Sequence, residues 1–325
     1  MSRDNATTLP DDHTVCVSVI ILTYNHKNFI AQAIEGALQQ QTTFPYEIII
    51  GEDESQDGTR EICIEYAEKY PNLIRLFLRS RKDVIHVDNR PTGRFNLIQS
   101  LKAARGKYIA MCEGDDYWTD PCKLQKQVNF LEANPDYVLC HHDAVMIDSD
   151  DQVIQESMVL NKQKRDLSPI GVVKNPEFVT ATVCYRNVLS KMPPEFMKVR
   201  GGDTFLFSIL GLYGKARYVD NVKVSCYRRH STGVWSSLSK LESLKHMANI
   251  RYWLGKYYAR IGKKRYAYYY LGQYHMRTGM INYHTGYKKN ARKHMVRSLR
   301  LSPWCWTTWH VFLSSELFGF RSRSA

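Results

Sequence analysis

The chain reads Ile109-Ala110-Met111-Cys112-Glu113-Gly114-Asp115-Asp116-Tyr117-Trp118 at the point that decides its fold. A short apolar run ends there in three carboxylates within four residues. The run has the length of a buried strand, so the acids should follow the strand's C-terminal end. In open α/β sheets, ligands bind at that edge. Crowded carboxylates repel one another unless a cation lies between them, and Mg²⁺ or Mn²⁺ favours oxygen ligands. The alternative is an acidic turn before a helix that starts at Asp120-Pro121.

Apolar runs alternate with helical patterns in the first part of the chain. Strands are predicted at residues 17–22, 48–50, 73–78 and 108–111, and helices at residues 29–38, 59–70 and 95–104. This alternation is typical of βαβ units around a buried, mostly parallel sheet. Less regular patterns follow: helices at residues 123–131 and 204–213, strands at 137–147, 178–185 and 222–227, and a hairpin arm at 152–160. The sequence therefore predicts an α/β fold.

A second acidic cluster, Glu52-Asp53-Glu54, follows the second predicted strand. We expect this strand and the fourth strand to be neighbours, both ending in carboxylates, which indicates a binding site. Asp53 is a candidate acceptor of hydrogen bonds from a nucleobase or a ribose, and Asp57 is a candidate cap for the next helix. Solvated loop acids are the alternative for either cluster taken alone.

Several classes of protein are excluded by what the loops and cysteines lack. The first strand-to-helix turn, residues 23–26, has no glycine, and no Gly-x-Gly-x-x-Gly follows a strand, which argues against dinucleotide enzymes and P-loop kinases. A diphosphate can still bind where a metal takes its charge. The 8 cysteines are scattered singly, so reduced thiols are expected. The polar residues 1–14 predict a flexible N-terminus and no signal peptide, and no run is apolar enough to span a bilayer, so a cytoplasmic protein is expected.

Positive charge is concentrated at the C-terminal end. Residues 238–325 hold 17 of the 45 Lys and Arg but 2 of the 32 Asp and Glu, and 10 of the 21 tyrosines. This composition predicts a near-neutral body and a basic helical extension at residues 238–325, with a boundary near residue 237. The extension is predicted to bind an anionic membrane surface. A helical tail packed on the body is the alternative. Nucleic acid is a weaker candidate, because no RNA-binding motif is visible.

Four motifs together resemble glycosyltransferase family 2. They are Val-Ile-Ile-Leu-Thr-Tyr-Asn (19–25), Glu-Asp-Glu-Ser-Gln-Asp-Gly-Thr (52–59), Ala-Arg-Gly-Lys-Tyr-Ile-Ala (104–110) and Glu-Gly-Asp-Asp-Tyr-Trp (113–118). The resemblance covers roughly residues 15–237. It implies a GT-A fold with a Rossmann-type sheet, and transfer of a sugar from a nucleotide sugar, usually with inversion.

The resemblance also implies roles for individual residues. Asp203 matches the catalytic base, and a divalent metal, Mg²⁺ or Mn²⁺, would be held by Glu113, Asp115 and His230. Residues implied to bind the nucleotide sugar are Thr23, Asn25, Glu52, Asp53, Asp116, Arg228 and Trp235. The chain departs from the family pattern in three places: Glu54 replaces a glycine, Glu113 an aspartate and Gly202 a glutamate. These departures leave the donor and acceptor preferences open.

The expected function is metal-dependent transfer of a sugar, most simply from a UDP-sugar, to a glycan or lipid-linked saccharide, in bacterial surface polysaccharide synthesis. The expected place is the cytoplasm, at the inner face of the membrane. A sugar nucleotidyltransferase is one alternative, but it needs a glycine-rich loop after the first strand. A non-catalytic nucleotide-binding protein whose basic tail binds RNA or membrane is another, although Asp53, Asp115 and Asp203 are all retained.

Overall fold

The computed structural model describes residues 15–159, 161, 164–230 and 238–303. The predicted flexible segment, residues 1–14, lies outside them. Contacts within the chain define two compact units. The α/β unit runs to Met192 and includes Leu206–His230, whereas the helical unit comprises Pro193–Phe205 and the chain from Ser231 onward. Each unit has its own packing, and the site described below lies in the first.

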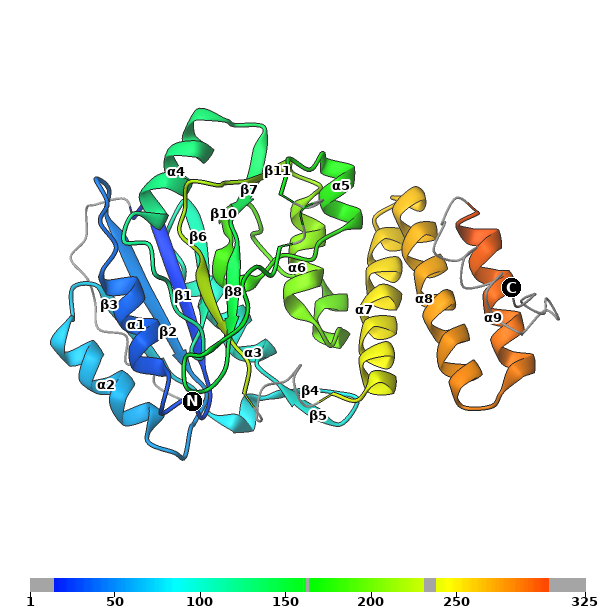
Figure 1. Cartoon of the computed structure of the whole chain (residues 1–325), viewed down its shortest axis with the longest axis horizontal. Helices are drawn as coiled ribbons and strands as arrows, with labels where there is room; N and C mark the ends of the chain where they lie inside the picture. Colours follow the sequence, from blue (N-terminus) through cyan, green and yellow to red (C-terminus); the bar gives the residue numbers. More distant parts are fainter. Residues whose placement is uncertain (1–14, 160, 162–163, 231–237, 304–325) are drawn as a thin grey trace. The chain divides into compact units, whose positions relative to one another are not determined.

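A seven-stranded sheet in the order β11-β7-β10-β6-β1-β2-β3 forms the centre of the α/β unit (Figure 1). Its strands are β1 (Val17–Thr23), β2 (Tyr46–Glu52), β3 (Ile74–Leu78), β6 (Tyr108–Glu113), β7 (Tyr137–His141), β10 (Cys184–Arg186) and β11 (Lys215–Tyr218). Strands β3, β2, β1 and β6 are parallel neighbours, and β11 is parallel to β7. Strand β10 runs antiparallel to β6 and β7. The predicted mostly parallel α/β sheet is confirmed.

Smaller elements surround the sheet. Strands β12 (Ser225–Arg228), β8 (Ala144–Ile147) and β9 (Val153–Gln155) form a three-stranded sheet, and β4 (Ile85–Val87) pairs with β5 (Arg90–Thr92). The helices are α1 (Ile30–Leu38), α2 (Thr59–Lys69), α3 (Arg94–Ala103), α4 (Lys123–Ala133), α5 (Pro169–Lys174) and α6 (Gly202–Leu210). Short 3₁₀ turns are η1 (Arg81–Asp83) and η3 (Thr180–Thr182).

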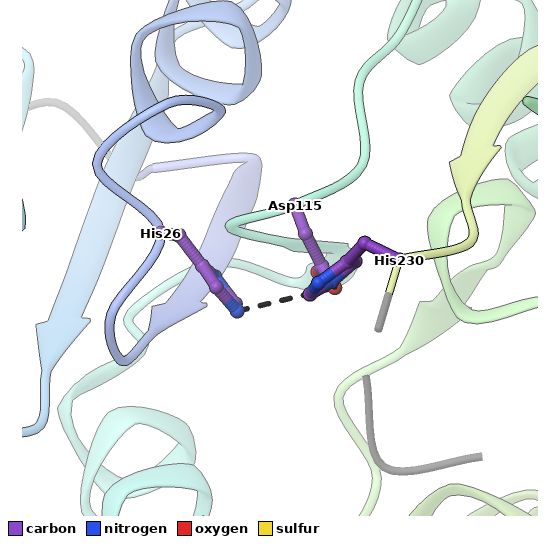
Figure 2. Close-up of side chains that lie close together, drawn as sticks. All are labelled: His26, Asp115 and His230. Atoms are coloured by element: carbon purple, nitrogen blue, oxygen red, sulfur yellow. Dashed lines mark hydrogen bonds and ion pairs between the residues drawn. The ribbon is translucent and has the colours of Figure 1, made fainter. Parts of the chain in front are cut away.

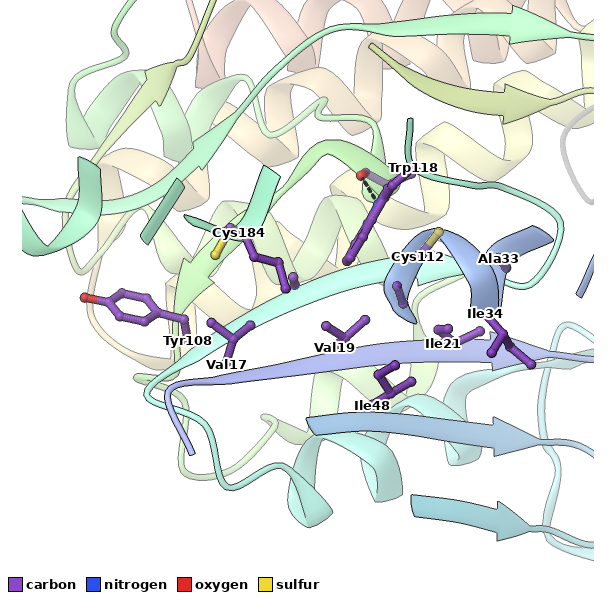
Figure 3. Close-up of a cluster of buried hydrophobic side chains, with 14 of the residues drawn as sticks. Val17, Val19, Ile21, Ala33, Ile34, Ile48, Tyr108, Cys112, Trp118 and Cys184 are labelled. Atoms are coloured by element: carbon purple, nitrogen blue, oxygen red, sulfur yellow. Dashed lines mark hydrogen bonds between the residues drawn. The ribbon is translucent and has the colours of Figure 1, made fainter. Parts of the chain in front are cut away.

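Alternating side chains of the central strands build the core (Figure 3). Val17, Val19 and Ile21 of β1 are fully buried with Ile34 of α1 and Leu124 of α4. Residues of opposite parity point to the other face, since side chains alternate along a strand. Gly51 lies on that face and contacts α3 closely: a Cβ there would lie 2.0 Å from Asn96 Oδ1. Helices therefore cover both faces and leave the C-terminal edge of the parallel strands for ligands.

The second and fourth predicted strands, β2 and β6, are not neighbours. Strand β1 lies between them and pairs with both. The prediction of adjacency was wrong because nothing in the two apolar runs specifies their order in the sheet. As a result, the loop after β1 lies between the two acidic clusters.

The segments after β6 differ most from the sequence prediction. The strand predicted at residues 137–147 is two strands, β7 and β8, separated by His142 and Asp143. Asp143 Oδ1 accepts hydrogen bonds from the backbone of Ala144, Met158 and Val159, so it fixes a bend instead of continuing the ladder. Residues 178–185 hold the turn η3 before the short strand β10, and the hairpin arm at 152–160 is reduced to β9.

The helical unit contains the 3₁₀ helix η4 (Pro194–Lys198) and the helices α7 (Lys240–Arg260), α8 (Lys264–His284) and α9 (Lys288–Leu301). Glu195 binds Arg260 through two hydrogen bonds of 2.6 and 2.8 Å, and Asn249 Oδ1 accepts from the backbone of Arg200. These contacts group Pro193–Phe205 with helices of the helical unit. The division of the chain into two units therefore differs from the single boundary predicted near residue 237. Within the described part of the chain, no helix is long and apolar enough to cross a membrane.

Candidate active site

Two loops at the C-terminal edge are joined by backbone hydrogen bonds. The backbone amides of Asn25, His26 and Lys27, after β1, donate to side chains of the loop after β2. Those side chains are Ser55 Oγ at 2.9 Å, Thr59 Oγ1 at 2.8 Å and Asp57 Oδ2 at 3.0 Å. Asp57 Oδ1 also accepts from the backbone of Thr59, the first residue of α2, although Gly58 and not Asp57 is at the N-cap position. The loop after β1 is therefore held in one conformation.

His26, Asp115 and His230 converge at this edge (Figure 2). His26 comes from the loop after β1, Asp115 from the turn after β6, and His230 from the segment after β12. The Nε2 atoms of His230 and His26 lie 2.9 and 3.9 Å from Asp115 Oδ2. One ligand atom from each residue lies within 4.8 Å of the others. A carboxylate and two imidazoles at this spacing are a donor set that fits one divalent cation.

Burial and charge set the protonation of the cluster. Burial opposes ionisation of Asp115, but the hydrogen bond from His230 and the two nearby imidazoles outweigh it and hold its pKa below the ordinary value. Burial lowers the pKa of His26, although Asp115 acts in the opposite direction. Burial and then repulsion from Asp115 raise the pKa of Asp116 well above the ordinary value. An ionised Asp115 and a neutral His26 are the forms that bind metal.

Gly114 makes the close approach of the turn after β6 possible. A Cβ on Gly114 would lie 2.6 Å from Thr23 Oγ1 and 2.9 Å from His26 Nδ1. A larger residue would therefore displace Thr23 or His26. Both of these atoms are buried and have no hydrogen-bond partner among the residues that the structure describes. The glycine between Glu113 and Asp115 is thus required by packing.

Asp53 lies at the end of β2 beside a stacked pair of side chains. Its Oδ2 accepts a hydrogen bond from Arg81 at 2.9 Å, and the Arg81 guanidinium lies 3.9 Å from the centre of the Tyr24 ring. Burial raises the pKa of Asp53, although Arg81 opposes the shift. Its Oδ1 is buried without a partner in the described part of the chain. This oxygen is an acceptor placed for a donor that the protein itself does not supply.

Glu52, Glu54 and Asn25 organise the loops. Glu52 is fully buried, and its oxygens accept from the backbone amides of Glu54 and Ser55 and from Arg60. Glu54 has a φ of 61°, which explains why glycine suits this position, and its carboxylate accepts from the backbone of Arg81 at 2.5 Å. Asn25, with a φ of 55°, accepts from the backbone of Gln56. Glu52 and Asn25 thus position the two loops, and the ligand contacts predicted for them stay predictions.

Arg228 is bonded to several partners within the protein. Its side chain is 1% exposed, and its guanidinium donates to the carbonyl oxygens of Asp115 and Asp148, to Gln32 Oε1 and to Asp151 Oδ1. Its backbone amide also donates to Asp116 Oδ1 at 2.9 Å. A ligand would have to break these bonds before it could bind the guanidinium. In the structure, Arg228 holds the turn after β6 against β12, and Asp116 takes part in the same contact. The ligand contacts predicted for Arg228 and Asp116 stay predictions.

Three other predicted residues are not among the converging side chains that the structure describes. Glu113 is the last residue of β6, and its side chain lies on the face of the sheet opposite to that of Cys112, which faces the core. It is not among the three converging residues. The structure therefore differs from the predicted metal set Glu113, Asp115 and His230: Glu113 is outside and His26 is inside. Asp203 lies in the first turn of α6, in the helical unit, where its Oδ1 accepts from the backbone of Thr204. Trp235 lies outside the described residues.

His26 was missed at the sequence level. A polar residue in a loop without regular spacing carries no pattern that predicts a ligand. What places it is the set of hydrogen bonds between the two loops, and these bonds join residues 30 to 33 positions apart. The one clue in the sequence is that an imidazole follows the first strand directly.

Comparisons with known proteins agree on the family. Residues 18–184 match the model described as Glycosyl transferase family 2. An uncharacterized protein of Mycobacterium tuberculosis (strain ATCC 25618 / H37Rv) is 36% identical over 223 residues, which are 68% of this chain and 61% of that protein. The Escherichia coli protein named UDP-Glc:alpha-D-GlcNAc-diphosphoundecaprenol beta-1,3-glucosyltransferase WfaP is 37% identical over 121 residues, 36% of this chain and 41% of that protein. This chain thus spans about 61% of the length of the mycobacterial relatives.

Solved structures show the same fold. Staphylococcus aureus TarS 1-349 in complex with UDP has a TM-score of 0.54 at 14% identity, covering 92% of this chain and 91% of that chain. Mannosyltransferase PcManGT from Pyrobaculum calidifontis, in complex with GDP-Man and Mn²⁺, has a TM-score of 0.52 at 16% identity, covering 97% and 85%. At these identities the likeness shows the GT-A fold alone. Because the family model covers more than half of the residues, the chain belongs to glycosyltransferase family 2.

Proposed function

We propose that this protein transfers a sugar from a nucleotide-sugar donor to an acceptor hydroxyl with inversion at the anomeric carbon. The observation that carries the proposal is the convergence of Asp115, His230 and His26 at the C-terminal edge of a family 2 sheet. Asp53 Oδ1 is buried and has no hydrogen-bond partner among the described residues, which supports the binding of a nucleoside at the same edge. The binding of UDP or GDP-Man by structural neighbours is consistent with a nucleotide sugar. A UDP-sugar is the donor we favour.

The residues of the chain have separate tasks in this reaction. Asp53 accepts a hydrogen bond from the nucleoside, and Arg81 fixes the orientation of its carboxylate. Thr23 lies against Gly114 at the end of β1, between the two acidic clusters. Asp115 and His230 would hold a divalent cation, Mg²⁺ or Mn²⁺, which when bound offsets the charge of the diphosphate leaving group. This assignment separates recognition of the nucleoside from stabilisation of the departing charge.

Asp203 is our candidate for the general base. In this role its carboxylate takes the proton from the acceptor hydroxyl as the oxygen attacks the anomeric carbon from the face opposite the diphosphate. A single displacement of this kind inverts the anomeric centre. The role rests on the match to the family pattern at Gly202-Asp203 and on the position of Asp203 in the first turn of α6.

The acceptor we propose is a lipid-linked saccharide of a cell-surface polysaccharide pathway. The name of the E. coli relative describes a glucosyltransferase acting on a diphosphoundecaprenol-linked sugar. Helix α9 offers a suitable membrane contact, because Lys289, Lys293 and Arg300 are exposed on the side opposite its buried residues Ala291, Met295 and Ser298. Such a contact would place the enzyme at the inner face of the cytoplasmic membrane.

Release of nucleoside diphosphate tests the proposal. The full-length protein is incubated with a panel of nucleotide sugars and with lipid-linked or free saccharides, in the presence of Mn²⁺, Mg²⁺ or EDTA. We expect release with one donor and a divalent metal, and a loss of at least about a hundredfold in Asp115→Asn, whose side chain keeps its shape but loses its charge.

Two outcomes would contradict it. A sugar nucleotidyltransferase would form pyrophosphate, and a non-catalytic nucleotide-binding protein would bind the donor without releasing either product. Asp150→Asn, at an exposed aspartate in the same unit, is the matched control and should keep wild-type turnover.

A further inference from the structure

His26 is held in place more firmly than an ordinary loop residue. Its backbone amide donates to Thr59 Oγ1 at 2.8 Å. Its carbonyl oxygen accepts from the backbone amides of Phe29 and Ile30, both at 2.9 Å, at the start of α1. Both sides of its peptide backbone are therefore fixed, so the Cα of His26 keeps its place beside the cluster.

Among the residues that the structure describes, the ring of His26 makes no hydrogen bond. Its Nδ1 is buried and has no hydrogen-bond partner within the described residues. Its Nε2 lies 3.9 Å from Asp115 Oδ2, which is too far for a hydrogen bond. The ring meets that of His230 edge to face, with 6.0 Å between the centroids. A half-buried imidazole aimed at a carboxylate and a second imidazole, but bonded to neither, has the position of a metal ligand.

We propose that His26 is a third protein ligand of the metal, and that the resulting set of two imidazoles and one carboxylate selects a transition-metal dication such as Mn²⁺ or Co²⁺ over Mg²⁺. Mg²⁺ favours oxygen ligands and keeps its water shell, whereas imidazole nitrogen favours the first-row transition metals. A site built from carboxylates and water alone lacks this nitrogen contribution to the preference. The two nitrogens are therefore the source of the selectivity.

Three protein ligands leave room for the donor. A six-coordinate ion held by three side chains keeps three positions for water or for diphosphate oxygens. The catalytic use of the site rests on the proposed function, whereas the binding preference does not, because it can be measured without donor or acceptor. The two ideas can thus fail separately.

Metal binding to the full-length protein tests the inference directly. Calorimetry or equilibrium dialysis gives the Kd of Mn²⁺ and of Mg²⁺, and the visible absorption of bound Co²⁺ reports nitrogen ligands. His275 and His294 form a second close pair of imidazoles, with Nδ1 atoms 2.9 Å apart, so all proteins in the test carry His275→Gln. This background removes the competing pair without touching the cluster.

We expect the reference protein to bind Mn²⁺ at least about tenfold more tightly than Mg²⁺. His26→Gln should weaken Mn²⁺ by at least about tenfold, change the Co²⁺ spectrum and leave Mg²⁺ nearly unchanged, since loss of even outer-shell partners costs 10- to 100-fold in affinity. His26→Glu, which supplies an oxygen in place of the nitrogen, should move the preference toward Mg²⁺. His86→Gln, at an exposed histidine, is the matched control and should behave like the reference.

Two results would overturn the inference. One is equal binding of Mn²⁺ and Mg²⁺ by the reference protein, and the other is unchanged Mn²⁺ affinity and Co²⁺ spectrum in folded His26→Gln, with folding checked by circular dichroism. If His26→Gln binds normally while Asp115→Asn loses both metal and turnover, the inference fails and the proposed function stands. If the metals bind as expected but no donor is turned over, the inference stands and the proposed function fails.

Discussion

The two units of this protein use charge in opposite ways. In the α/β unit, some of the acids that follow β2 and β6 are buried: Asp53 and Asp116 are each 2% exposed. In the helical unit, α9 has no acid in its sequence, and its cations lie on the exposed side. A buried charge is expensive, so it marks a binding or positioning role. An exposed charge costs little and acts at longer range in a salt-dependent way.

Asp203 is the proposed catalytic residue that belongs to the helical unit, so it tests most strongly whether the two units differ in this way. Asp203→Asn retains an oxygen for the backbone amide of Thr204 but cannot take a proton. We expect the rate to fall by about 10² to 10⁴, the usual contribution of a general base, while stability stays nearly the same. Steady-state kinetics and thermal unfolding of the same samples check this.

The exposed Asp220→Asn is the control for Asp203 and should change neither rate nor stability. If Asp203→Asn keeps the wild-type rate per folded molecule but unfolds more easily, the residue has a structural role only. In that case the proposed chemistry would be confined to the α/β unit, and the charges of the helical unit would act only at its surface.

Arg228 and Arg229 sharpen the same comparison within two adjacent residues. Arg228 is buried and bonded to three other segments, whereas Arg229 is exposed. Removing Arg228 takes the donor from part-buried carbonyl oxygens and leaves a void beside Phe29, whose ring centre lies 4.6 Å from the guanidinium. We expect Arg228→Ala to lower the free energy of unfolding by about 3 to 4 kcal/mol, and Arg229→Ala by less than about 0.5 kcal/mol.

Denaturant unfolding measures both variants. Equal and small losses would return Arg228 to the set of ligand-binding candidates. A large loss in Arg228→Ala, with a normal donor KM in the folded fraction, would support its positioning role.

The predictability of the fold also differs between regions. The first half could be predicted, because β1, β2, β3 and β6 are continuous apolar runs separated by helices of regular period. The order of β2 and β6 could not, because nearly equivalent apolar runs do not specify which neighbour each strand takes. The bend at Asp143 was missed since it depends on hydrogen bonds to Met158 and Val159, which are distant in the sequence.

The candidate site was predictable where motifs are dense. Asp115 and His230 lie together as the predicted metal set required. His26 and Arg228 show the limit of the motif: one enters the cluster through bonds between two loops, and the other is consumed by partners that no local pattern reveals. A motif gives the type of a side chain and its place along a strand. Its orientation depends on what the surrounding backbone offers.

Lys123 is a buried cation of the α/β unit, and it tests how burial of a charge affects the stability of the fold. It is fully buried, donates to Gln127 Oε1 at 2.7 Å and lies 4.1 Å from the Trp118 ring centre, among the thiols of Cys112, Cys140 and Cys184. Burial lowers its pKa to about 8. Between that pKa and the unfolded value of about 10.4, the unfolded chain binds more protons, so this lysine makes stability rise with pH through that window.

Lys123→Met removes this contribution. We therefore expect the unfolding free energy of Lys123→Met, measured relative to wild type, to fall by about 2 to 3 kcal/mol from pH 7 to pH 10. Ionisation of the buried cysteines affects both proteins and cancels in the difference. Lys102→Met, at an exposed lysine, should show no such trend, and a flat difference for Lys123→Met would mean that its ammonium is not penalised by burial.

The exposed cations of α9 are expected to attract an anionic membrane surface. Each Lys or Arg near an anionic leaflet contributes about 1 kcal/mol, so replacing Lys289, Lys293 and Arg300 with Gln should weaken binding by about a hundredfold at low salt. Liposome flotation of the full-length protein measures this. Wild type should float with anionic vesicles, sink at high salt and ignore neutral vesicles. Gln replacements at the exposed Lys69, Lys102 and Lys191 of the α/β unit change the net charge equally and should leave flotation intact. If both triple variants float alike, net charge and not the face of α9 brings the protein to the membrane, and the helical unit carries its charge only for solvation.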